Sequence, residues 1–336
     1  MKRIIAAIIS VMLMLTGCSA AHDDAQDAQP LRRQELLMDT VVEITIYEGG
    51  SETMLDGAFA LCREYEALFS RTIDASDISR INAAHGAPVE VSDDTVSLLE
   101  GALGYSRLSD GAFDPTIEPL VSLWNINSDA PHVPDADEIQ QALTRVDWTQ
   151  VRVSENTVTL PDGMGLDLGG IAKGYIADRL REYLHEQGAK SAIINLGGNV
   201  LTLGSKPGGV PFTIGARKPF AQSQGEIIGA CRVSDKSIVT SGVYERYFEQ
   251  DGRLYHHILD TATGYPVDNG VYSVTIISQS SMDGDALSTI CLALGQERGL
   301  ELIESLDGVE AIYFMADGSY ALSSGADEYW LYPDEL

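Results

Sequence analysis

Basic residues are scarce in this sequence. Lys and Arg together number 22 among 336 residues, against 50 Asp and Glu, so the formal net charge is −28. A chain this acidic is a poor binder of nucleic acid, whose phosphates are held by Lys and Arg. The charge favours solubility and says little about the fold. Any site for an anionic ligand would therefore need a local cation or a metal ion.

Cysteine is scarce as well. The chain has only Cys18, Cys62, Cys231 and Cys291, and their spacings match no metal-binding knuckle. Apart from Cys18, three cysteines remain, and three cannot pair completely. Because Cys62 and Cys291 lie in apolar helical patterns, we expect buried free thiols rather than a disulfide framework.

The N-terminal apolar run is too short to cross a bilayer as a permanent helix. It extends over residues 4–15, follows Lys2 and Arg3, and is typical of a secretory signal. The sequence LTGC at residues 15–18 resembles a bacterial lipobox, which implies cleavage before Cys18 and attachment of lipid to its sulfur. The alternative is an ordinary signal followed by a chance cysteine.

The chain divides into three expected segments. Residues 1–17 form the signal peptide, and residues 18–30 form a polar tether that cannot bury enough apolar surface to fold. Residues 31–336 contain no linker and form either one large domain or two fused lobes. Removal of Lys2 and Arg3 leaves 20 basic residues against 50 acidic ones, a net charge of −30. We expect this mature chain at the extracytoplasmic face of the bacterial cell membrane, anchored by its lipid.

The folded segment mixes helices with strands that mostly arrive in hairpins. Alternating or β-branched patterns predict strands at 38–49, 190–204, 211–219, 230–242, 253–260 and 272–278. A further strand is expected to end at Leu166 and Leu168, and hairpins are expected at 151–163 and 309–324. Helical spacing predicts helices at 51–70, 92–111, 135–146, 171–183 and 285–295, whereas 77–84 is interpreted as a loop or turn. Because strict βαβ alternation is missing, we expect an α+β fold with mixed, largely antiparallel sheets flanked by helices.

The stretch DLGGIAKGYIADRL, residues 167–180, lacks both the Walker spacing and the dinucleotide-binding spacing of glycines. Its Gly169-Gly170 turn nevertheless exposes backbone groups just before a helix, and a helix start attracts anions. Lys173 adds a positive charge, and Asp167 adds an acceptor. The alternative is a plain strand–helix corner with a lysine facing solvent.

A second stretch, MDGDALSTICLALG (282–295), places Asp285, Ser288 and Thr289 on one face of a helix. A carboxylate with hydroxyls forms a hard oxygen site that suits Mg²⁺ or Ca²⁺. Alternatively, Asp285 caps the helix and the hydroxyls are ordinary polar positions.

A third stretch, YHHILDTATGYPV (255–267), contains adjacent histidines. In a strand, His256 and His257 point to opposite faces, so at most one of them faces a given site. A lone strand histidine is also compatible with a purely structural role.

These three stretches, together with FSRTIDASDISRIN, GAFDPTIEPLVSLW and INLGGNV, resemble the FAD:protein FMN transferases, the ApbE family of flavin-transferring lipoproteins. The resemblance spans about residues 36–324. It implies a Mg²⁺-dependent enzyme that takes FAD as substrate and transfers FMN to a threonine or serine hydroxyl of a partner protein. A phosphoester forms and AMP is released. The implied partners are membrane redox subunits of the Rnf or sodium-translocating quinone reductase type.

The resemblance also implies roles for individual residues. The backbone carbonyl of Gly170 and the side chains of Asp285, Ser288 and Thr289 match metal ligands, and His257 matches a proposed base. The positions that match FAD-binding residues of relatives are Met38, Ala112, Phe113, Asp114, Asp167 and Lys173. Two departures stand out: Asp39 replaces a glycine often found after the methionine, and Thr261 replaces a proline.

Three other functions remain open at the level of sequence. One is an FAD pyrophosphatase, in which water replaces the protein acceptor and the products are FMN and AMP. Another is a non-catalytic flavin-binding lipoprotein. A solute-binding lipoprotein would share the signal and the tether, but it would not explain the helix of Asp285 or the Gly-Gly-Lys turn.

Overall fold

The computed structural model describes residues 29–223 and 225–335. The predicted signal peptide (1–17), the predicted lipidation site Cys18 and the tether up to residue 28 lie outside the described residues. Within the described part, no helix is both long enough and apolar enough to span a bilayer.

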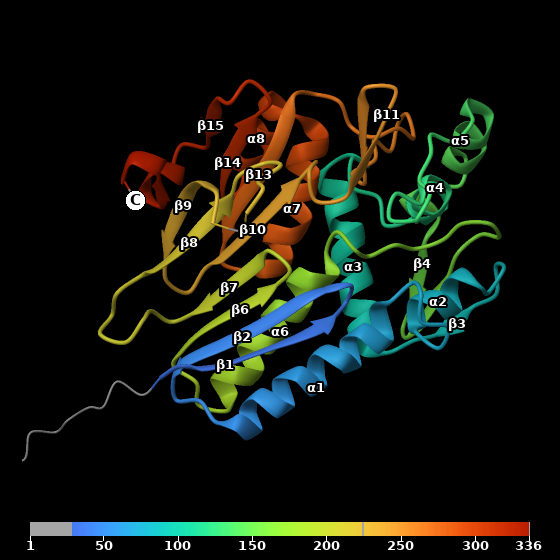
Figure 1. Ribbon diagram of the computed structural model, residues 1–336. Coiled ribbons are helices and arrows are strands. Elements are labelled where there is room, and N and C mark those ends of the chain that lie inside the picture. The colour runs from blue at the N-terminus through green and yellow to red at the C-terminus, as the bar shows by residue number, and fades with distance from the viewer. Residues whose placement is uncertain (1–28, 224, 336) are drawn as a thin grey trace, which may run out of the picture.

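An eight-stranded antiparallel sheet forms the centre of the fold (Figure 1). The order of the strands across the sheet follows their order along the chain, and hairpins join β1 to β2, β6 to β7 and β14 to β15. The strands are, in that order, β1 (Leu31–Leu37), β2 (Thr40–Glu48), β6 (Ser191–Leu196), β7 (Asn199–Leu203), β10 (Ser237–Gly242), β13 (Val271–Ser278), β14 (Glu310–Met315) and β15 (Tyr320–Leu322).

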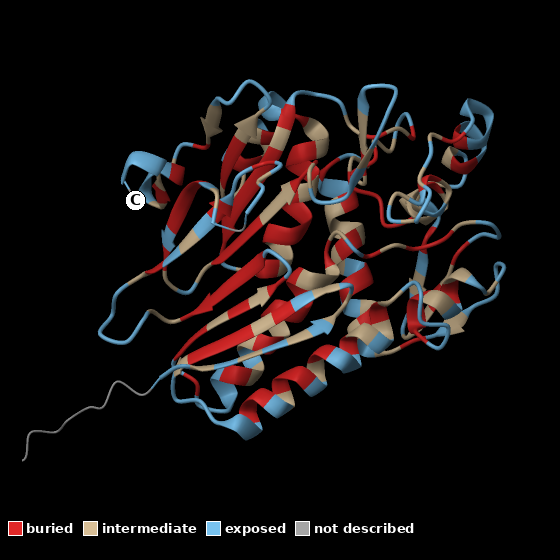
Figure 2. Cartoon of the chain, in the orientation of Figure 1, coloured by how far each residue is buried: buried red, intermediate tan, exposed pale blue. Residues whose placement is uncertain are grey.

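Helices α1 (Glu52–Phe69), α6 (Ala172–Glu186), α7 (Ser281–Leu294) and α8 (Gln296–Glu304) pack along one face of this sheet. Figure 2 shows the consequence for α1, whose buried and exposed residues alternate along its length. Leu55, Phe59 and Cys62 on its buried stripe are fully inaccessible to solvent. The periodic apolar pattern therefore becomes the contact between helix and sheet.

Smaller elements surround this core. A three-stranded sheet covers part of the other face and consists of β8 (Phe212–Arg217), β9 (Ile227–Val233) and β16 (Trp330–Leu331). A peripheral region contains α2 (Asp77–Asn82), α3 (Asp93–Leu108), α4 (Glu118–Trp124), α5 (Ala136–Leu143), β3 (Val89–Glu90), β4 (Arg152–Ser154) and β5 (Thr157–Thr159). The hairpin of β11 (Tyr247–Gln250) and β12 (Arg253–His256) packs against α4 and α5 through an aromatic cluster.

The expected α+β class is confirmed. Every ladder between named strands of the described chain is antiparallel, and the one parallel contact is an isolated bridge between Ile117 and Gly165. Ser51 caps α1 by accepting a hydrogen bond from the Met54 N–H at 3.2 Å. Cys62, Cys231 and Cys291 are buried free thiols.

Four local predictions are wrong. The segment 230–242 is not one strand, because β9 and β10 lie in different sheets. Residues 77–84 are not a loop, because Ser76 caps the short helix α2. Leu166 and Leu168 are buried but belong to no strand. The segment 190–204 is not one strand: Gly197 and Gly198, both with positive φ, turn the chain between β6 and β7. The element β1 was not expected, since its hairpin turn consists of Met38 and Asp39 rather than a usual turn pair.

Candidate functional site

A cavity of about 430 Å³ opens where the ends of the central strands meet the peripheral region. This volume lies in the range of small-molecule sites. Ten of the eleven predicted site residues within the described chain line it: Met38, Ala112, Phe113, Asp114, Asp167, Gly170, Lys173, His257, Asp285 and Thr289. Segments far apart in the sequence thus meet at one place.

The glycine corner forms one wall of this cavity. The Asp167 carboxylate accepts a hydrogen bond from the Gly169 N–H at 2.8 Å, which closes a tight turn before α6. Ile171, at the N-cap position of α6, supplies no side-chain cap. The Lys173 ammonium reaches back and donates to the Gly169 carbonyl at 3.2 Å. The corner therefore presents a cation and the start of a helix to the cavity.

Asp285 provides the missing cap from a different helix. Its Oδ2 accepts a hydrogen bond from the Gly174 N–H at 2.9 Å, and its Oδ1 lies 3.8 Å from the Lys173 Nζ. In a continuing helix the Gly174 N–H would bond to the Gly170 carbonyl, so this carbonyl has no backbone hydrogen bond among the described residues. Asp285 does not cap its own helix α7, because Ser280 does so by accepting from the Asp283 N–H. The alternative role for Asp285 as the cap of α7 is therefore excluded.

Oxygen atoms from these two helices converge at the corner. A Cβ atom placed on Gly170 would lie 3.6 Å from the Thr289 Oγ1, so the glycine backbone and this hydroxyl are neighbours. Thr289 Oγ1 also lies 3.4 Å from the Asp285 carbonyl oxygen. A backbone carbonyl, a carboxylate oxygen and a hydroxyl are the donors that a hard divalent cation prefers. The residues present therefore fit a Mg²⁺ ion, whose remaining ligands would be supplied by substrate phosphate or water.

Ser288 is placed differently from the other predicted ligands. It is fully buried and is not part of the cavity lining. Its hydroxyl donates to the Asp285 carbonyl at 3.0 Å and lies 2.8 Å from the Ser241 hydroxyl. No trio of His, Cys, Asp and Glu capable of holding a metal occurs in the described part of the chain. Any metal here would rest on the mixed set of Gly170, Asp285 and Thr289.

Other predicted flavin-pocket residues lie on the turn between β1 and β2 and on the loop before α4. Met38 and Asp39 have φ of 53° and 55°, the left-handed pair of a two-residue hairpin turn. The Met38 N–H donates to the Glu66 carboxylate at 2.7 Å, which fixes this turn against α1. Phe113 is buried and lies against Gly170, with its Cε2 3.1 Å from where a Cβ would stand.

Both carboxylate oxygens of Asp114 accept hydrogen bonds from nearby residues. Its Oδ1 accepts from the Thr116 N–H and hydroxyl, and its Oδ2 accepts from the Trp148 N–H at 3.0 Å. Burial raises the pKa of this carboxyl despite these hydrogen bonds. The residue lines the cavity and shapes the loop of Ala112 and Phe113, and its direct contact with FAD stays a prediction.

The two histidines lie in different environments, although β12 ends at His256 and His257 lies outside the strand. His256 is buried, and its Nε2 donates to the Val267 carbonyl at 2.8 Å, which makes it structural. His257 lines the cavity, and its Nδ1 lies 3.3 Å from the Arg246 carbonyl. A carbonyl only accepts, so Nδ1 carries the proton and Nε2 keeps a free lone pair. Burial, together with the charge of Arg246, lowers the pKa of His257 to about 3, which keeps the ring neutral.

Sequence reasoning missed several cavity residues. Arg71 lies within the stretch FSRTIDASDISRIN, but the sequence alone assigned it no function. Arg71 lines the cavity, and its Nε lies 3.2 Å from the Asp167 carboxylate. Glu245 and Arg246 also line the cavity. Burial of the Glu245 carboxyl in the cavity raises its pKa to about 7, and the negative charge of Asp285 also raises it. The stretch YERYFE that contains them has no distinctive spacing.

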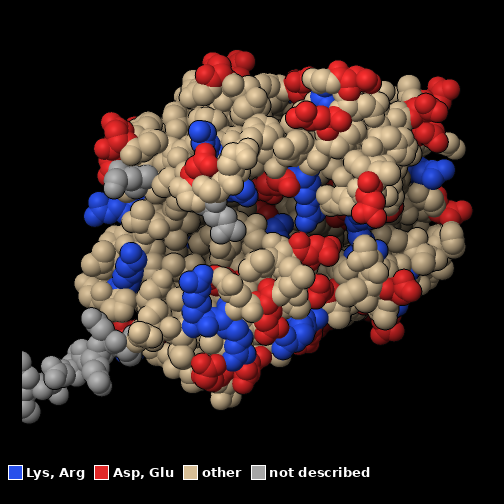
Figure 3. All heavy atoms as spheres, viewed as in Figure 1, with Lys and Arg blue, Asp and Glu red and all other residues tan. Residues whose placement is uncertain are grey.

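The cavity lining carries charges of both signs. Three basic residues of the described chain line it, Arg71, Lys173 and Arg246, together with six acidic ones: Asp39, Glu66, Asp114, Asp167, Glu245 and Asp285. Figure 3 shows Asp and Glu around much of the outline of this face, and both acidic and basic side chains across its middle. The cavity is therefore not positive as a whole, and an anionic ligand would depend on these individual cations and on a metal ion.

Comparison with known proteins gives one consistent result. A family model described as the ApbE family matches residues 38–313. An FAD:protein FMN transferase of Klebsiella pneumoniae (strain 342) is 42% identical over 293 residues, covering 86% of this chain and 90% of that protein. One of Treponema pallidum (strain Nichols) is 38% identical over 314 residues, covering 87% and 86%.

Solved structures are similar in fold as well. The ApbE protein of Thermotoga maritima superposes with a TM-score of 0.83 at 31% identity, over 90% of this chain and 99% of that one. The flavin transferase ApbE of Vibrio cholerae has a TM-score of 0.80 at 28% identity, over 90% and 99% of the two chains.

Proposed function

The chain belongs to the ApbE family and is an FAD:protein FMN transferase, and we propose that it transfers FMN from FAD to a threonine or serine hydroxyl of a partner protein, with Mg²⁺ as cofactor. The observation that carries this proposal is the convergence of Asp285, Thr289, the Gly170 carbonyl and Lys173 at one corner of the cavity. Such a corner can hold a pyrophosphate together with a divalent cation.

In the proposed reaction the acceptor oxygen attacks the phosphorus of the FMN half. The bond between this phosphorus and the oxygen of the AMP half breaks, so the products are a phosphoester and AMP. Phosphoryl transfer mainly requires positioning and stabilisation of charge. When bound, Mg²⁺ supplies charge neutralisation at the pyrophosphate, and Gly170, Asp285 and Thr289 would hold it.

The side chains divide the remaining work. Lys173, already within 3.8 Å of the Asp285 carboxylate, can hold a non-bridging phosphate oxygen. The acceptor hydroxyl must lose a proton, and the free Nε2 of neutral His257 can accept it once the hydroxyl is within hydrogen-bond reach. Met38, Phe113 and the turn at Gly169 enclose the flavin nucleotide and exclude water.

The family and the lipobox-like sequence together indicate what kind of protein the partner is and where it lies. We propose an extracytoplasmic threonine in a membrane redox subunit of the Rnf or sodium-translocating quinone reductase type as the acceptor. Lipid attached to Cys18 would hold the enzyme at the membrane surface where such subunits lie. Both points rest on the lipobox-like sequence and on the family, because Cys18 lies outside the described residues.

One experiment tests the transfer directly. The protein is incubated with FAD, Mg²⁺ and a partner domain that carries an exposed threonine, and the partner is then weighed by mass spectrometry. A mass gain equal to FMN, together with AMP in solution, is expected. Free FMN with an unmodified partner would instead indicate a pyrophosphatase, and intact FAD would indicate a flavin-binding protein without catalysis.

A further inference from the structure

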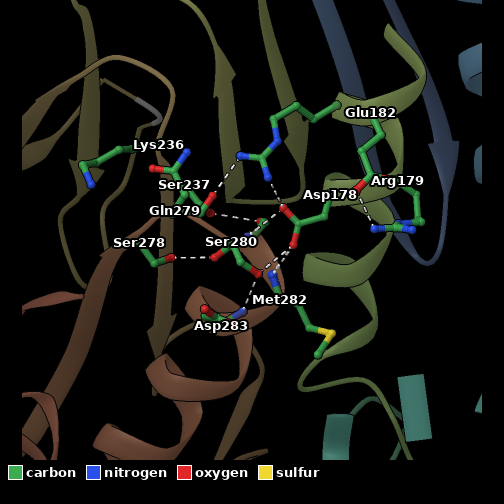
Figure 4. A network of polar contacts seen from close by, with 12 residues as sticks. Asp178, Arg179, Glu182, Lys236, Ser237, Ser278, Gln279, Ser280, Met282 and Asp283 are labelled. Carbon is green, nitrogen blue, oxygen red and sulfur yellow. Dashed lines mark hydrogen bonds and ion pairs between the residues drawn. The ribbon is translucent and has the colours of Figure 1, made fainter. Parts of the chain in front are cut away.

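The carboxylate of Asp178, on α6, lies directly against the first turn of α7 (Figure 4). Its Oδ1 accepts a hydrogen bond from the Ser281 N–H at 2.9 Å, and its Oδ2 accepts from the Met282 N–H at 3.0 Å. The Ser280 hydroxyl donates to the same Oδ2 at 2.8 Å. Asp178 is only 8% exposed, so these bonds are shielded from water. A negative charge at this end of α7 is also favoured by the helix dipole.

Arg181 completes the contact from one turn further along α6. One of its terminal nitrogens pairs with the Asp178 Oδ1 at 3.1 Å. The other donates to the Gln279 carbonyl at 2.8 Å, in the chain that leads into α7. Asp178 and Arg181, both on α6, together make hydrogen bonds to residues 279–282.

The same pair of helices touches again next to the site. A Cβ atom on Gly174 would lie 2.3 Å from the Ser281 carbonyl oxygen, so the two backbones are in direct contact there. Gly174, Asp178 and Arg181 are spaced i, i+4 and i+7, so one face of α6 makes all of these contacts. That helix carries Lys173, whereas α7 carries Asp285 and Thr289.

We propose that Asp178 is a positioning residue of the transfer site, which holds α7 in register with α6 so that Asp285 and Thr289 meet the glycine corner. This inference rests on the proposed metal-assisted transfer. Asp178 touches neither the cavity nor the reacting atoms, since it is absent from the cavity lining. It acts through the relative position of the two helices.

An ordinary capping role does not explain these contacts. Helix α7 already has a local cap, because the Ser280 hydroxyl accepts from the Asp283 N–H at 3.2 Å. The bonds of Asp178 come from a separate helix more than 100 residues away in the chain. Such bonds fix where α7 lies as well as whether it forms. Groups that orient the ligands of a metal commonly change metal affinity when they are removed.

The chain offers a matched control in Asp77. This residue is 5% exposed, pairs with Arg80 three positions later, and accepts from the Ser92 N–H at 2.9 Å and the Thr95 hydroxyl at 2.7 Å. It thus braces the start of α3 much as Asp178 braces α7. None of these residues lines the cavity. Loss of Asp77 should therefore cost stability without moving the metal ligands.

The test compares Asp178→Asn with Asp77→Asn in the full chain. Asparagine keeps the size of the side chain but presents an NH₂ group to backbone N–H donors on one side. Urea denaturation, the kcat and KM for FAD, and the Mg²⁺ concentration for half-maximal FMN transfer are measured. Both variants should be less stable than the wild type. Only Asp178→Asn should raise the Mg²⁺ requirement, by about 10- to 100-fold, and Asp77→Asn should leave it within about twofold.

A second variant covers the case in which Asp178→Asn does not fold. Arg181→Gln leaves the carboxylate in place but removes the grip on Gln279, and it should raise the Mg²⁺ requirement in the same direction by several fold. A Mg²⁺ requirement equal to that of Asp77→Asn in whichever variant folds overturns the inference. A wild type that transfers FMN equally well without a divalent cation overturns the proposed metal site itself, and the two failures are thus distinguished.

Discussion

Substitution of Gly174 by alanine tests the contact between α6 and α7 most directly. The added Cβ would lie 2.3 Å from the Ser281 carbonyl oxygen and 2.6 Å from the Met282 Cα. Both are backbone atoms, so no side chain can rotate away. Carbon and oxygen atoms need about 1 Å more than this, and the helices must therefore separate by about that amount. The hydrogen bond from the Gly174 N–H to Asp285, now 2.9 Å, would be lost.

The expected loss of stability follows from three contributions. Overpacking costs about 1–3 kcal/mol, and loss of a hydrogen bond to a charged acceptor costs about 1.5–3 kcal/mol. Replacement of glycine by alanine within a helix returns about 1 kcal/mol. The free energy of unfolding should therefore fall by about 3 kcal/mol. Because Asp285 moves relative to the corner, the rate of FMN transfer should fall by about 100-fold.

The assay has a control within the same chain. Gly104 also lies within a helix, α3, but a Cβ placed there would meet no atom within 4 Å. Gly104→Ala should raise stability by up to about 1 kcal/mol and leave transfer unchanged. Both variants are compared with the wild type by urea denaturation and by mass spectrometry of the flavinylated partner. Wild-type stability together with a wild-type rate for Gly174→Ala would refute the close contact of the helices.

Three further predictions concern single side chains. Asp285→Asn keeps an acceptor for the Gly174 N–H and should stay folded by circular dichroism, yet lose Mg²⁺-dependent transfer by at least about 100-fold. In the unfolded chain His257 takes up a proton near its ordinary pKa of 6.5, whereas in the folded chain its lowered pKa keeps it neutral, so this residue lowers the stability of the fold as the pH falls. At pH 5 the free energy of unfolding of the wild type should fall by about 1 kcal/mol relative to that of His257→Gln, after allowance for solvent in the cavity, as measured by urea titration. Gly197 has φ of 65°, and a Cβ there would lie 2.1 Å from the Thr40 Oγ1. Gly208 also has a positive φ, but its surroundings are open, so Gly197→Ala should lower the free energy of unfolding by about 2 kcal/mol more than Gly208→Ala. Equal losses in urea denaturation would contradict the contact with Thr40.

Elements with strong local signals could be predicted from the sequence. Ser51 and Ser92 begin α1 and α3 because each hydroxyl accepts from an N–H three residues later, a bond that depends only on nearby residues. The turn of Met38 and Asp39 could not be predicted in this way. Both residues adopt a left-handed conformation that local sequence disfavours, and the Glu66 carboxylate, 28 residues away, holds Met38 in place. Tertiary contact here overrides local preference.

The candidate site shows the same division. The spacing of Asp285 and Thr289 places both on one helix face, and both line the cavity. The same spacing also includes Ser288, whose hydroxyl turns instead to Ser241 on β10. Helical periodicity predicts only roughly which residues lie on the same side of a helix. Packing against the neighbouring strand decides which of these residues face the cavity. Arg71 was missed because its partner Asp167 is 96 positions away, beyond any local pattern.

The electrostatics of the corner explain why one carboxylate suffices for the proposed cation. Asp285 is the single acidic ligand in the predicted set, and one of its oxygens is already bonded to the Gly174 N–H. Lys173 lies beside the other oxygen, so without substrate the ammonium competes with a metal for the same charge. A pyrophosphate adds negative charge at this point and can accept both cations at once. Mg²⁺ and FAD should therefore bind interdependently, and each should raise the affinity of the site for the other. In a chain of net charge −28, this arrangement draws the cation to the loaded site rather than to the acidic surface.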